Sequence, residues 1–138
     1  MRVLIDTCVF LWMRMAPDRL APDVRKMLVD RTNDVLFSAV SSWEIGIKFS
    51  IGRLDLPEPP AVFVPARIAS SGLTPVAVEH SHALGVASLP MHHRDPFDRL
   101  LIAQATEMQV PIVTDDRNFD LYEIEVIPAV PPSESSIF

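Results

Sequence analysis

The stretch RVLID at residues 2–6 decides the class of fold, because it is a continuous apolar run that ends in an acid. Unbroken apolar character predicts a strand that is buried on both faces, as strands are in a parallel sheet. The next residues, TCVFLWMRM at 7–15, predict a helix that Pro17 interrupts. The chain therefore starts with a buried strand that leads directly into a helix.

Predicted strands and helices alternate along the rest of the chain. Further strands are expected at 34–37, 73–78, 110–114 and 124–127. Helices are expected at 22–30, 43–51, 61–71, 79–89 and 96–108, with Ser41 or Ser42 as the cap of the helix at 43–51. Pro75 cannot donate a ladder hydrogen bond, which places its strand near an edge of the sheet.

The alternation predicts the overall organisation of the chain. We expect one α/β domain over residues 1–130, built on a mainly parallel sheet of about five strands. Residues 131–138 are a Pro/Ser tail that we expect to be poorly ordered.

Composition and charge narrow the functions to consider. The single cysteine, Cys8, excludes an internal disulfide and favours a reducing compartment. No apolar run reaches the length of a membrane span and no cleavable signal pattern is present, so we expect a cytoplasmic protein that makes no membrane contact. The net charge of −6 disfavours a passive nucleic-acid binder. It does not disfavour a nuclease whose acidic residues hold metal ions that face the phosphate.

Four acids lie where the sites of parallel sheets form, beyond the carboxyl ends of the strands. Asp6 and Asp116 follow two predicted strands, Glu44 lies near the start of a predicted helix, and Asp98 lies near the start of another. Carboxylates in one place repel each other unless a cation joins them, and Mg²⁺ and Mn²⁺ prefer carboxylate oxygen. The set predicts a metal site suited to phosphodiester hydrolysis, whereas zinc is a poor fit without a histidine pair or a second cysteine.

Each acid also has a purely structural explanation. Asp6 can cap a helix, Asp116 can shape a turn, and Glu44 and Asp98 suit the positive end of a helix dipole. Asp95 suits the cap of the helix that begins at Pro96. A capping carboxylate has fewer lone pairs left for a cation, so Asp98 is the better metal ligand of the two.

Other polar and aromatic residues have weaker signals. The accessory candidates beside the acids are Asp95, Asp115, Thr7 and Thr114, and the basic candidates for contact with RNA phosphates are Lys48, Arg94 and Arg99. His80 and His82 are expected at the surface, and the pair at 92–93 in a solvated loop, with substrate contact as the alternative. Trp12 and Trp43 are expected in the core rather than as platforms for bases.

Four segments resemble the PIN-domain family, and within it the VapC toxins of toxin–antitoxin modules. They are LIDTCVFLW at 4–12, SAVSSWEIGIK at 38–48, LPMHHRDPFDRLLIAQA at 89–105 and IVTDDRNF at 112–119. The segments follow the family's order, and HHRDPFDRLL is the most specific of them. The resemblance implies a three-layer α/β/α fold and Mg²⁺- or Mn²⁺-dependent endoribonuclease activity. It also implies inhibition by a small VapB-like antitoxin, a homodimer, and a site made by the four acids Asp6, Glu44, Asp98 and Asp116.

Two other functions fit parts of the pattern. A Mg²⁺-dependent phosphoryl-transfer domain also uses aspartates at strand ends. However, a receiver domain requires a lysine after the fourth strand, and the last lysine of this chain is Lys48. A dehalogenase-like phosphatase requires an acid two residues after Asp6, and this chain has Cys8 at that position. The second alternative is a degenerate PIN-like interaction module without catalysis, against which the presence of all four acids argues.

Overall fold

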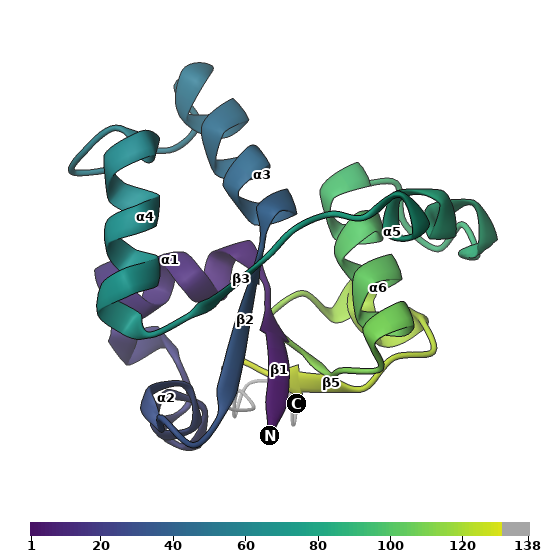
Figure 1. The fold of residues 1–138 in the computed structure, drawn as a ribbon, viewed down its shortest axis with the longest axis horizontal. Coiled ribbons are helices and arrows are strands. Elements are labelled where there is room, and N and C mark those ends of the chain that lie inside the picture. Colours follow the sequence, from purple (N-terminus) through teal and green to yellow (C-terminus); the bar gives the residue numbers. More distant parts are fainter. Residues whose placement is uncertain (131–138) are drawn as a thin grey trace, which may run out of the picture.

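A five-stranded parallel sheet with the strand order β3-β2-β1-β4-β5 forms the centre of the molecule (Figure 1). The computed structural model describes residues 1–130, so the predicted tail at 131–138 lies outside the described residues. The strands are β1 (Arg2–Ile5), β2 (Asp34–Ser38), β3 (Thr74–Val76), β4 (Ile112–Thr114) and β5 (Val126–Pro128). Every pairing between them is parallel, as the buried run at the N-terminus predicts.

Helical connections join the strands. They are α1 (Thr7–Met15), the 3₁₀ turn η1 (Pro17–Arg19), α2 (Pro22–Val29), α3 (Ala39–Ser50), α4 (Pro60–Ser71), α5 (His80–Gly85), the 3₁₀ turn η2 (Val86–Ser88), α6 (Pro96–Met108) and the 3₁₀ turn η3 (Arg117–Leu121). Within residues 1–130, none of these helices has the length and apolar character that crossing a bilayer requires.

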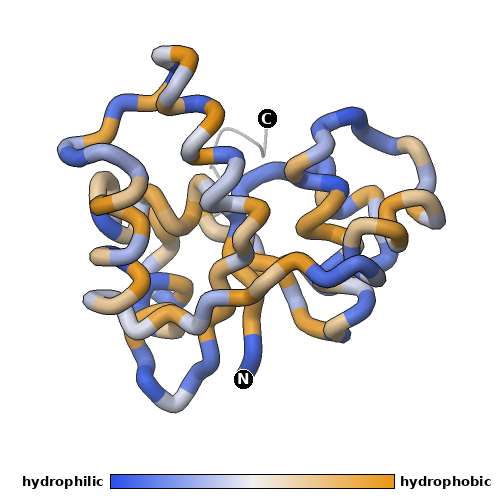
Figure 2. Tube along the Cα trace, turned by 45° about the horizontal axis from the view of Figure 1, so that its top comes forward, coloured by the Kyte–Doolittle hydropathy of each residue, from blue (hydrophilic) through white to orange (hydrophobic). Residues whose placement is uncertain are grey.

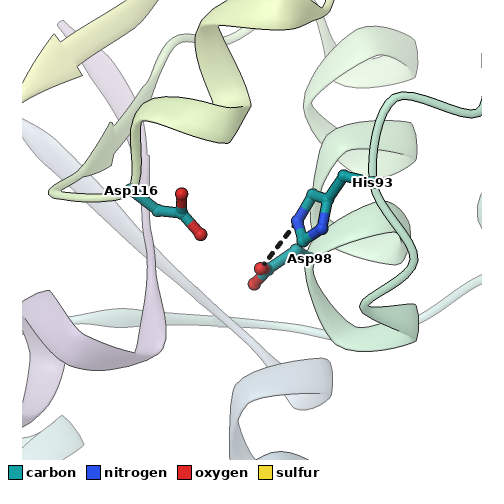
Figure 3. Close-up of side chains that lie close together, drawn as sticks. All are labelled: His93, Asp98 and Asp116. Atoms are coloured by element: carbon teal, nitrogen blue, oxygen red, sulfur yellow. Dashed lines mark hydrogen bonds and ion pairs between the residues drawn. The ribbon is translucent and has the colours of Figure 1, made fainter.

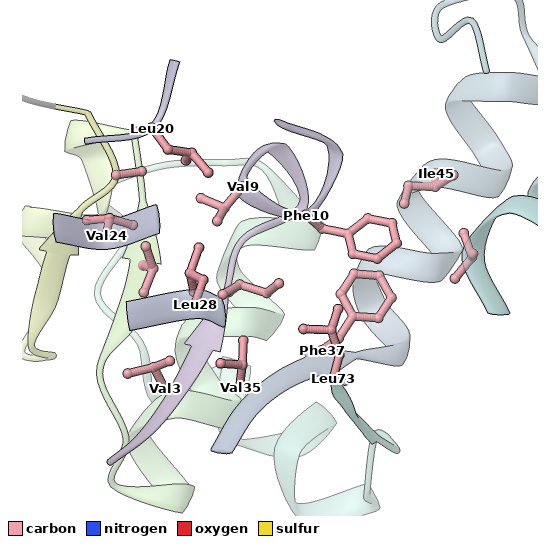
Figure 4. Close-up of a cluster of buried hydrophobic side chains, with 14 of the residues drawn as sticks. Val3, Val9, Phe10, Leu20, Val24, Leu28, Val35, Phe37, Ile45 and Leu73 are labelled. Atoms are coloured by element: carbon pink, nitrogen blue, oxygen red, sulfur yellow. The ribbon is translucent and has the colours of Figure 1, made fainter. Parts of the chain in front are cut away.

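Apolar side chains cover both faces of the sheet, which produces three layers. Val3 and Ile5 of β1 join one buried cluster with Phe10 (Figure 4), whereas Leu4 between them joins a second cluster with Leu101. Successive strand residues point to opposite faces, so the two clusters lie on opposite sides of the sheet. Figure 1 shows α1, α2 and α4 on one side of the sheet and α5 and α6 on the other. The predicted three-layer α/β/α fold is confirmed.

Hydropathy along the trace follows this layering. Figure 2 shows hydrophobic segments gathered in the central strands and hydrophilic segments in the peripheral connections. The central strands are continuous apolar runs in the sequence because neither of their faces meets water.

The boundaries of α6 and the edge position of β3 agree with the sequence predictions, whereas the start of α3 does not. The helix expected at 43–51 begins at Ala39, because the hydroxyl of Ser38 accepts a hydrogen bond from the Val40 N–H at 3.1 Å. The cap is thus the last residue of β2, and the chain passes from strand to helix without a loop. Glu44 therefore lies in the second turn of α3, too far from the start for the helix dipole to explain it.

The helix expected at 79–89 and the strand expected at 73–78 also differ from the prediction. The helix predicted at 79–89 is divided into α5 and η2, with the change at Gly85, a residue of low helix propensity. The strand expected at 73–78 is the three-residue β3, which pairs on one side only, with β2. Pro75 fits this position because an edge strand can do without its N–H.

Candidate metal centre

A cavity of about 570 Å³ opens beyond the carboxyl ends of β1 and β4. Asp6 comes directly after β1 and Asp116 two residues after the end of β4, whereas Glu44 lies on α3 and Asp98 on α6. The acids that line the cavity are Asp6, Glu44, Asp95, Asp98, Asp115 and Asp116. The structure therefore brings together all four acids of the predicted site, which are up to 110 positions apart in the chain (116 minus 6).

Asp6 caps α1 and faces the cavity at the same time. Its Oδ1 accepts a hydrogen bond from the Thr7 N–H at 2.7 Å, and its Oδ2 accepts one from the Thr114 hydroxyl at 2.7 Å. The carboxylate is buried, and desolvation raises its pKa despite these hydrogen bonds, with further contributions from Glu44 and Asp116. The structural explanation for Asp6 is thus correct without excluding a role in the site.

The two threonines beside the acids position the carboxylates. Thr114 donates to Asp6 and accepts a hydrogen bond from the Asp116 N–H at 3.0 Å, so one hydroxyl joins the acids that follow β1 and β4. The Thr7 hydroxyl lies 2.6 Å from Glu44 Oε1 and 2.8 Å from the Ser41 hydroxyl. A hydroxyl has one proton, so Thr7 donates to the carboxylate and accepts from Ser41.

Glu44 is buried in the second turn of α3 with both oxygens engaged. Thr7 donates to Oε1, and the ammonium group of Lys48, one turn further along the helix, pairs with Oε2. Burial alone would lower the pKa of Lys48, but the neighbouring Glu44 carboxylate raises it overall. Lys48 therefore stays charged at the cavity wall, where the sequence predicted a basic residue.

Asp95 and Asp98 divide two tasks at the start of α6. Asp95 is the cap, because its Oδ1 accepts hydrogen bonds from the Phe97 N–H at 2.9 Å and the Asp98 N–H at 3.2 Å. The Asp98 carboxylate is buried, and its pKa is raised to about 8. Desolvation is the main cause, followed by the charges of Asp6 and the other nearby carboxylates. A cation in the cavity would reverse this shift.

Asp116 faces Asp98 across the cavity, and a histidine completes the group (Figure 3). Ligand atoms of His93, Asp98 and Asp116 all lie within 4.8 Å of one another. Asp116 also shapes the turn that follows β4, since its Oδ1 accepts a hydrogen bond from the Asn118 N–H at 2.9 Å.

His93 is the functional candidate that the sequence prediction undervalued. The prediction of a solvated loop is wrong for it, because its side chain is only 12% exposed and its Nε2 lies 3.0 Å from Asp98 Oδ2. Two signals were available: its place just before the predicted cap at Asp95, and its position within HHRDPFDRLL, the segment with the most specific family resemblance.

Arg99 is not placed as an RNA-binding residue would be, and Arg94 lies away from the acidic cavity. Arg99 is buried, and its guanidinium donates to the carbonyls of Val86 and Pro90 and to the Tyr122 hydroxyl. Its predicted contact with RNA phosphates is wrong for this position, because these acceptors already use the guanidinium. Arg94 is exposed and lines a separate apolar hollow rather than the acidic cavity.

Several expectations about aromatic and histidine residues also change. Trp43 is 54% exposed rather than in the core, with its ring against Phe97. His82, expected at the surface, is buried, accepts the Glu79 N–H at 3.0 Å and pairs with Glu107. Neither position could be predicted from local spacing, because both depend on which helices meet.

Comparison with known proteins identifies the family of this chain. Residues 3–125 match the family model for the PIN domain. A stretch of 69 residues is 41% identical to Ribonuclease VapC16 of Mycobacterium tuberculosis, and it covers 50% of this chain and 48% of that protein. The match thus spans about half the length of this curated relative.

Solved structures of low sequence identity share the fold. VapBC2 from Rickettsia felis, bound to a promoter DNA fragment, has a TM-score of 0.69 at 12% identity over 92% of this chain and 98% of that chain. DNA-bound VapBC from Salmonella typhimurium has a TM-score of 0.65 at 15% identity over 92% and 97%. The family match covers most of the chain and agrees with the topology and with the acidic cavity. The chain belongs to the PIN domain family.

Proposed function

We propose that this protein is a Mg²⁺- or Mn²⁺-dependent endoribonuclease and the toxin of a toxin–antitoxin pair. The observation that carries the proposal is the convergence of Asp6, Glu44, Asp98 and Asp116 on one cavity at the carboxyl edge of the sheet. Membership of the PIN domain family and the partial likeness to a protein named as a ribonuclease support it.

The donor set fits a hard divalent cation. Asp98 and Asp116 would hold the ion, since their oxygens lie close together and Asp98 is not used as a cap. Asp6 and Glu44 add negative charge at the same cavity, and Lys48 compensates for part of it. The bound cation would lower the pKa of a water molecule and neutralise phosphate oxygens. Carboxylate and water ligands suit Mg²⁺ or Mn²⁺ better than zinc.

Residues of the chain itself would receive the RNA. Lys48 and Arg53 line the same cavity as the acids and can contact phosphates on either side of the cleaved bond. Thr114 orients the carboxylate of Asp6 and Thr7 that of Glu44, and the Ser41 hydroxyl hydrogen-bonds to Thr7 in turn. With a net charge of −6, the protein has little general attraction for RNA, so contact should concentrate at the cation and these few basic groups.

We further propose a VapB-like antitoxin as partner, a homodimer as the assembly and the cytoplasm as the location. The antitoxin is supported by the shared fold with proteins described as VapBC complexes. The homodimer is supported by an apolar hollow whose lining includes Trp43, Val86, Met91 and Leu100, since exposed apolar surface of this kind marks interfaces. The cytoplasm is supported by the single cysteine.

The experiment that tests the proposed function compares Asp6→Asn and Glu44→Gln with the wild type. Both variants should lose RNA cleavage in Mn²⁺, while Tm in chelator should stay the same or rise, because each change removes one charge from a crowded group of carboxylates. Asn can still cap α1 at position 6 through its Oδ1, so that variant keeps the helix start while it removes the charge and the oxygen that accepts from the Thr114 hydroxyl. Retained cleavage in both variants, or a large fall in Tm for both, would mean that the acids are structural.

A further inference from the structure

His93 is the one described histidine among the side chains that face Asp98. Its ring comes from the segment between η2 and α6, and its Nε2 lies 3.0 Å from Asp98 Oδ2 (Figure 3). Asp116 approaches Asp98 from the opposite side of the cavity. Two roles are compatible with this proximity: a nitrogen ligand for the cation, or a hydrogen-bond donor that orients the Asp98 carboxylate.

The second nitrogen of the ring decides between these roles. The backbone N–H of Asp95 points at His93 Nδ1, with 3.4 Å between the nitrogens. An N–H donor requires a lone pair on its acceptor, so Nδ1 carries no proton. The ring proton is then on Nε2, and this N–H points at Asp98 Oδ2, 3.0 Å away. A nitrogen that carries a proton has no lone pair for a metal ion.

The backbone that carries His93 is itself fixed by Arg99. The guanidinium donates to the carbonyl of Pro90 at 2.9 Å, to that of Leu89 at 3.4 Å and to that of His93 at 3.4 Å. The planar guanidinium group has several N–H donors and can therefore hold several carbonyls of one segment at once. The ammonium group of a lysine cannot do so with the same geometry. Arg99 lies next to Asp98 on α6, so the helix that supplies the acid also holds the loop that supplies the histidine.

We propose that His93 is a positioning residue for the metal centre: its Nε2–H holds Asp98 Oδ2, which leaves Oδ1 for the cation shared with Asp116, and Arg99 holds the loop in place. This inference rests on the proposed metal-dependent function. Groups that orient a metal-binding side chain in this way contribute strongly to metal affinity, with losses of about 10- to 100-fold when they are removed.

The test measures Mn²⁺ affinity by the EPR signal of free Mn²⁺, in the full-length protein and without RNA. His93→Phe keeps a ring but removes both nitrogens, and we expect it to weaken Mn²⁺ binding at least about 10-fold. His93→Gln places an amide N–H near the position of Nε2–H, and it should bind Mn²⁺ within a few-fold of the wild type. His92→Phe is the matched control, since His92 is exposed in the same loop, and its affinity should not change.

Pulsed EPR of wild-type protein with Mn²⁺ distinguishes the two roles without any substitution. A donor to Asp98 predicts no coupling between Mn²⁺ and an imidazole nitrogen. Such coupling in the wild type, an unchanged affinity in His93→Phe, or a His93→Gln variant as weak as His93→Phe would each overturn the assignment.

The affinity readout separates this inference from the proposed function. Protein that binds Mn²⁺ with the expected dependence on His93 but leaves RNA intact would contradict only the ribonuclease. Mn²⁺-dependent cleavage in a protein whose Mn²⁺ affinity does not depend on His93 would contradict only the positioning role.

Discussion

Single carboxylates in this molecule combine structural and chemical tasks. Asp6 and Asp116 each use an oxygen to accept a backbone N–H at the start of a helical segment, and each also lines the acidic cavity. At the start of α6 the two tasks are divided, with Asp95 as the cap and Asp98 turned toward the cavity. The question of whether an acid is structural or functional therefore has a different answer at each position.

The division between Asp95 and Asp98 gives a test with two matched variants. Asp98→Asn should remove nearly all RNA cleavage in Mn²⁺, because the position keeps its shape but loses a charge that the cation needs. Asp95→Asn should cost little activity, since asparagine caps helices as well as aspartate does. The measurement is the cleavage rate of both variants at matched fractions of folded protein. An active Asp98→Asn beside an inactive Asp95→Asn would reverse the assignment.

The raised pKa of Asp98 predicts how stability changes with pH when divalent cations are removed. The folded-state pKa is about 8, above the ordinary value of about 3.9 for an unfolded aspartate, so the folded protein binds the proton more tightly. The free energy of unfolding should therefore fall as pH rises from about 4 to about 8. Asp98→Asn should remove this contribution and gain stability relative to wild type over the same interval. Denaturant titrations in chelator at several pH values measure it, and a constant difference between the two proteins would contradict it.

At the scale of elements, the sequence predicted those parts of the fold that depend on local pattern. The apolar runs gave β1 and β2, and Asp95-Pro96 gave the start of α6, because a cap and a first-turn proline act within a few residues. The start of α3 was missed because the cap, Ser38, still belongs to the preceding strand.

The candidate acids were predicted for a similar reason, whereas their supporting residues were not. All four acids follow a strand or lie in a helix that borders the carboxyl edge of the sheet, which a prediction of secondary structure can locate. His93 and Arg99 depend on the path of the irregular segment between η2 and α6, which no periodicity describes. The partners of Arg99 lie up to 23 residues away in the chain, so a buried role could not be distinguished from a surface one.

Arg99 should stabilise the segment between η2 and α6 through the carbonyls that it contacts. Arg99→Met keeps the volume of the side chain but leaves several carbonyls of the segment at 86–93 without their donor. We expect the free energy of unfolding to fall by about 2–4 kcal/mol, in the range for loss of a buried hydrogen-bond network. Arg94→Met, at an exposed neighbour, should change stability by less than about 0.5 kcal/mol. Equal stability of the two variants in urea titrations would contradict the role given to Arg99.

For the whole molecule, the distribution of charge suggests how a partner would control it. Among residues 1–130, six acids line the cavity, and the protein has a net charge of −6, so a basic side chain from outside would be attracted to it. An arginine of an antitoxin can pair with a carboxylate through two hydrogen bonds and compete with the cation.

We expect the protein to be toxic in cells that lack its antitoxin. Expression should arrest growth, and co-expression of the cognate VapB-like antitoxin should relieve the arrest. Asp98→Asn should not be toxic, which separates RNA cleavage from an effect of overproduction. A verified antitoxin that binds tightly but leaves RNA cleavage unchanged would show that the partner does not act at the acidic cavity.

RNA cleavage by metal-free protein to which Mn²⁺ is returned tests whether the carboxylate cavity holds the catalytic cation. We expect negligible cleavage in excess chelator, recovery when Mn²⁺ exceeds the chelator, and no recovery in Asp98→Asn under the same conditions. Cleavage of equal rate in chelator and in Mn²⁺ would contradict the assignment of the carboxylate cavity as the cation site of a ribonuclease.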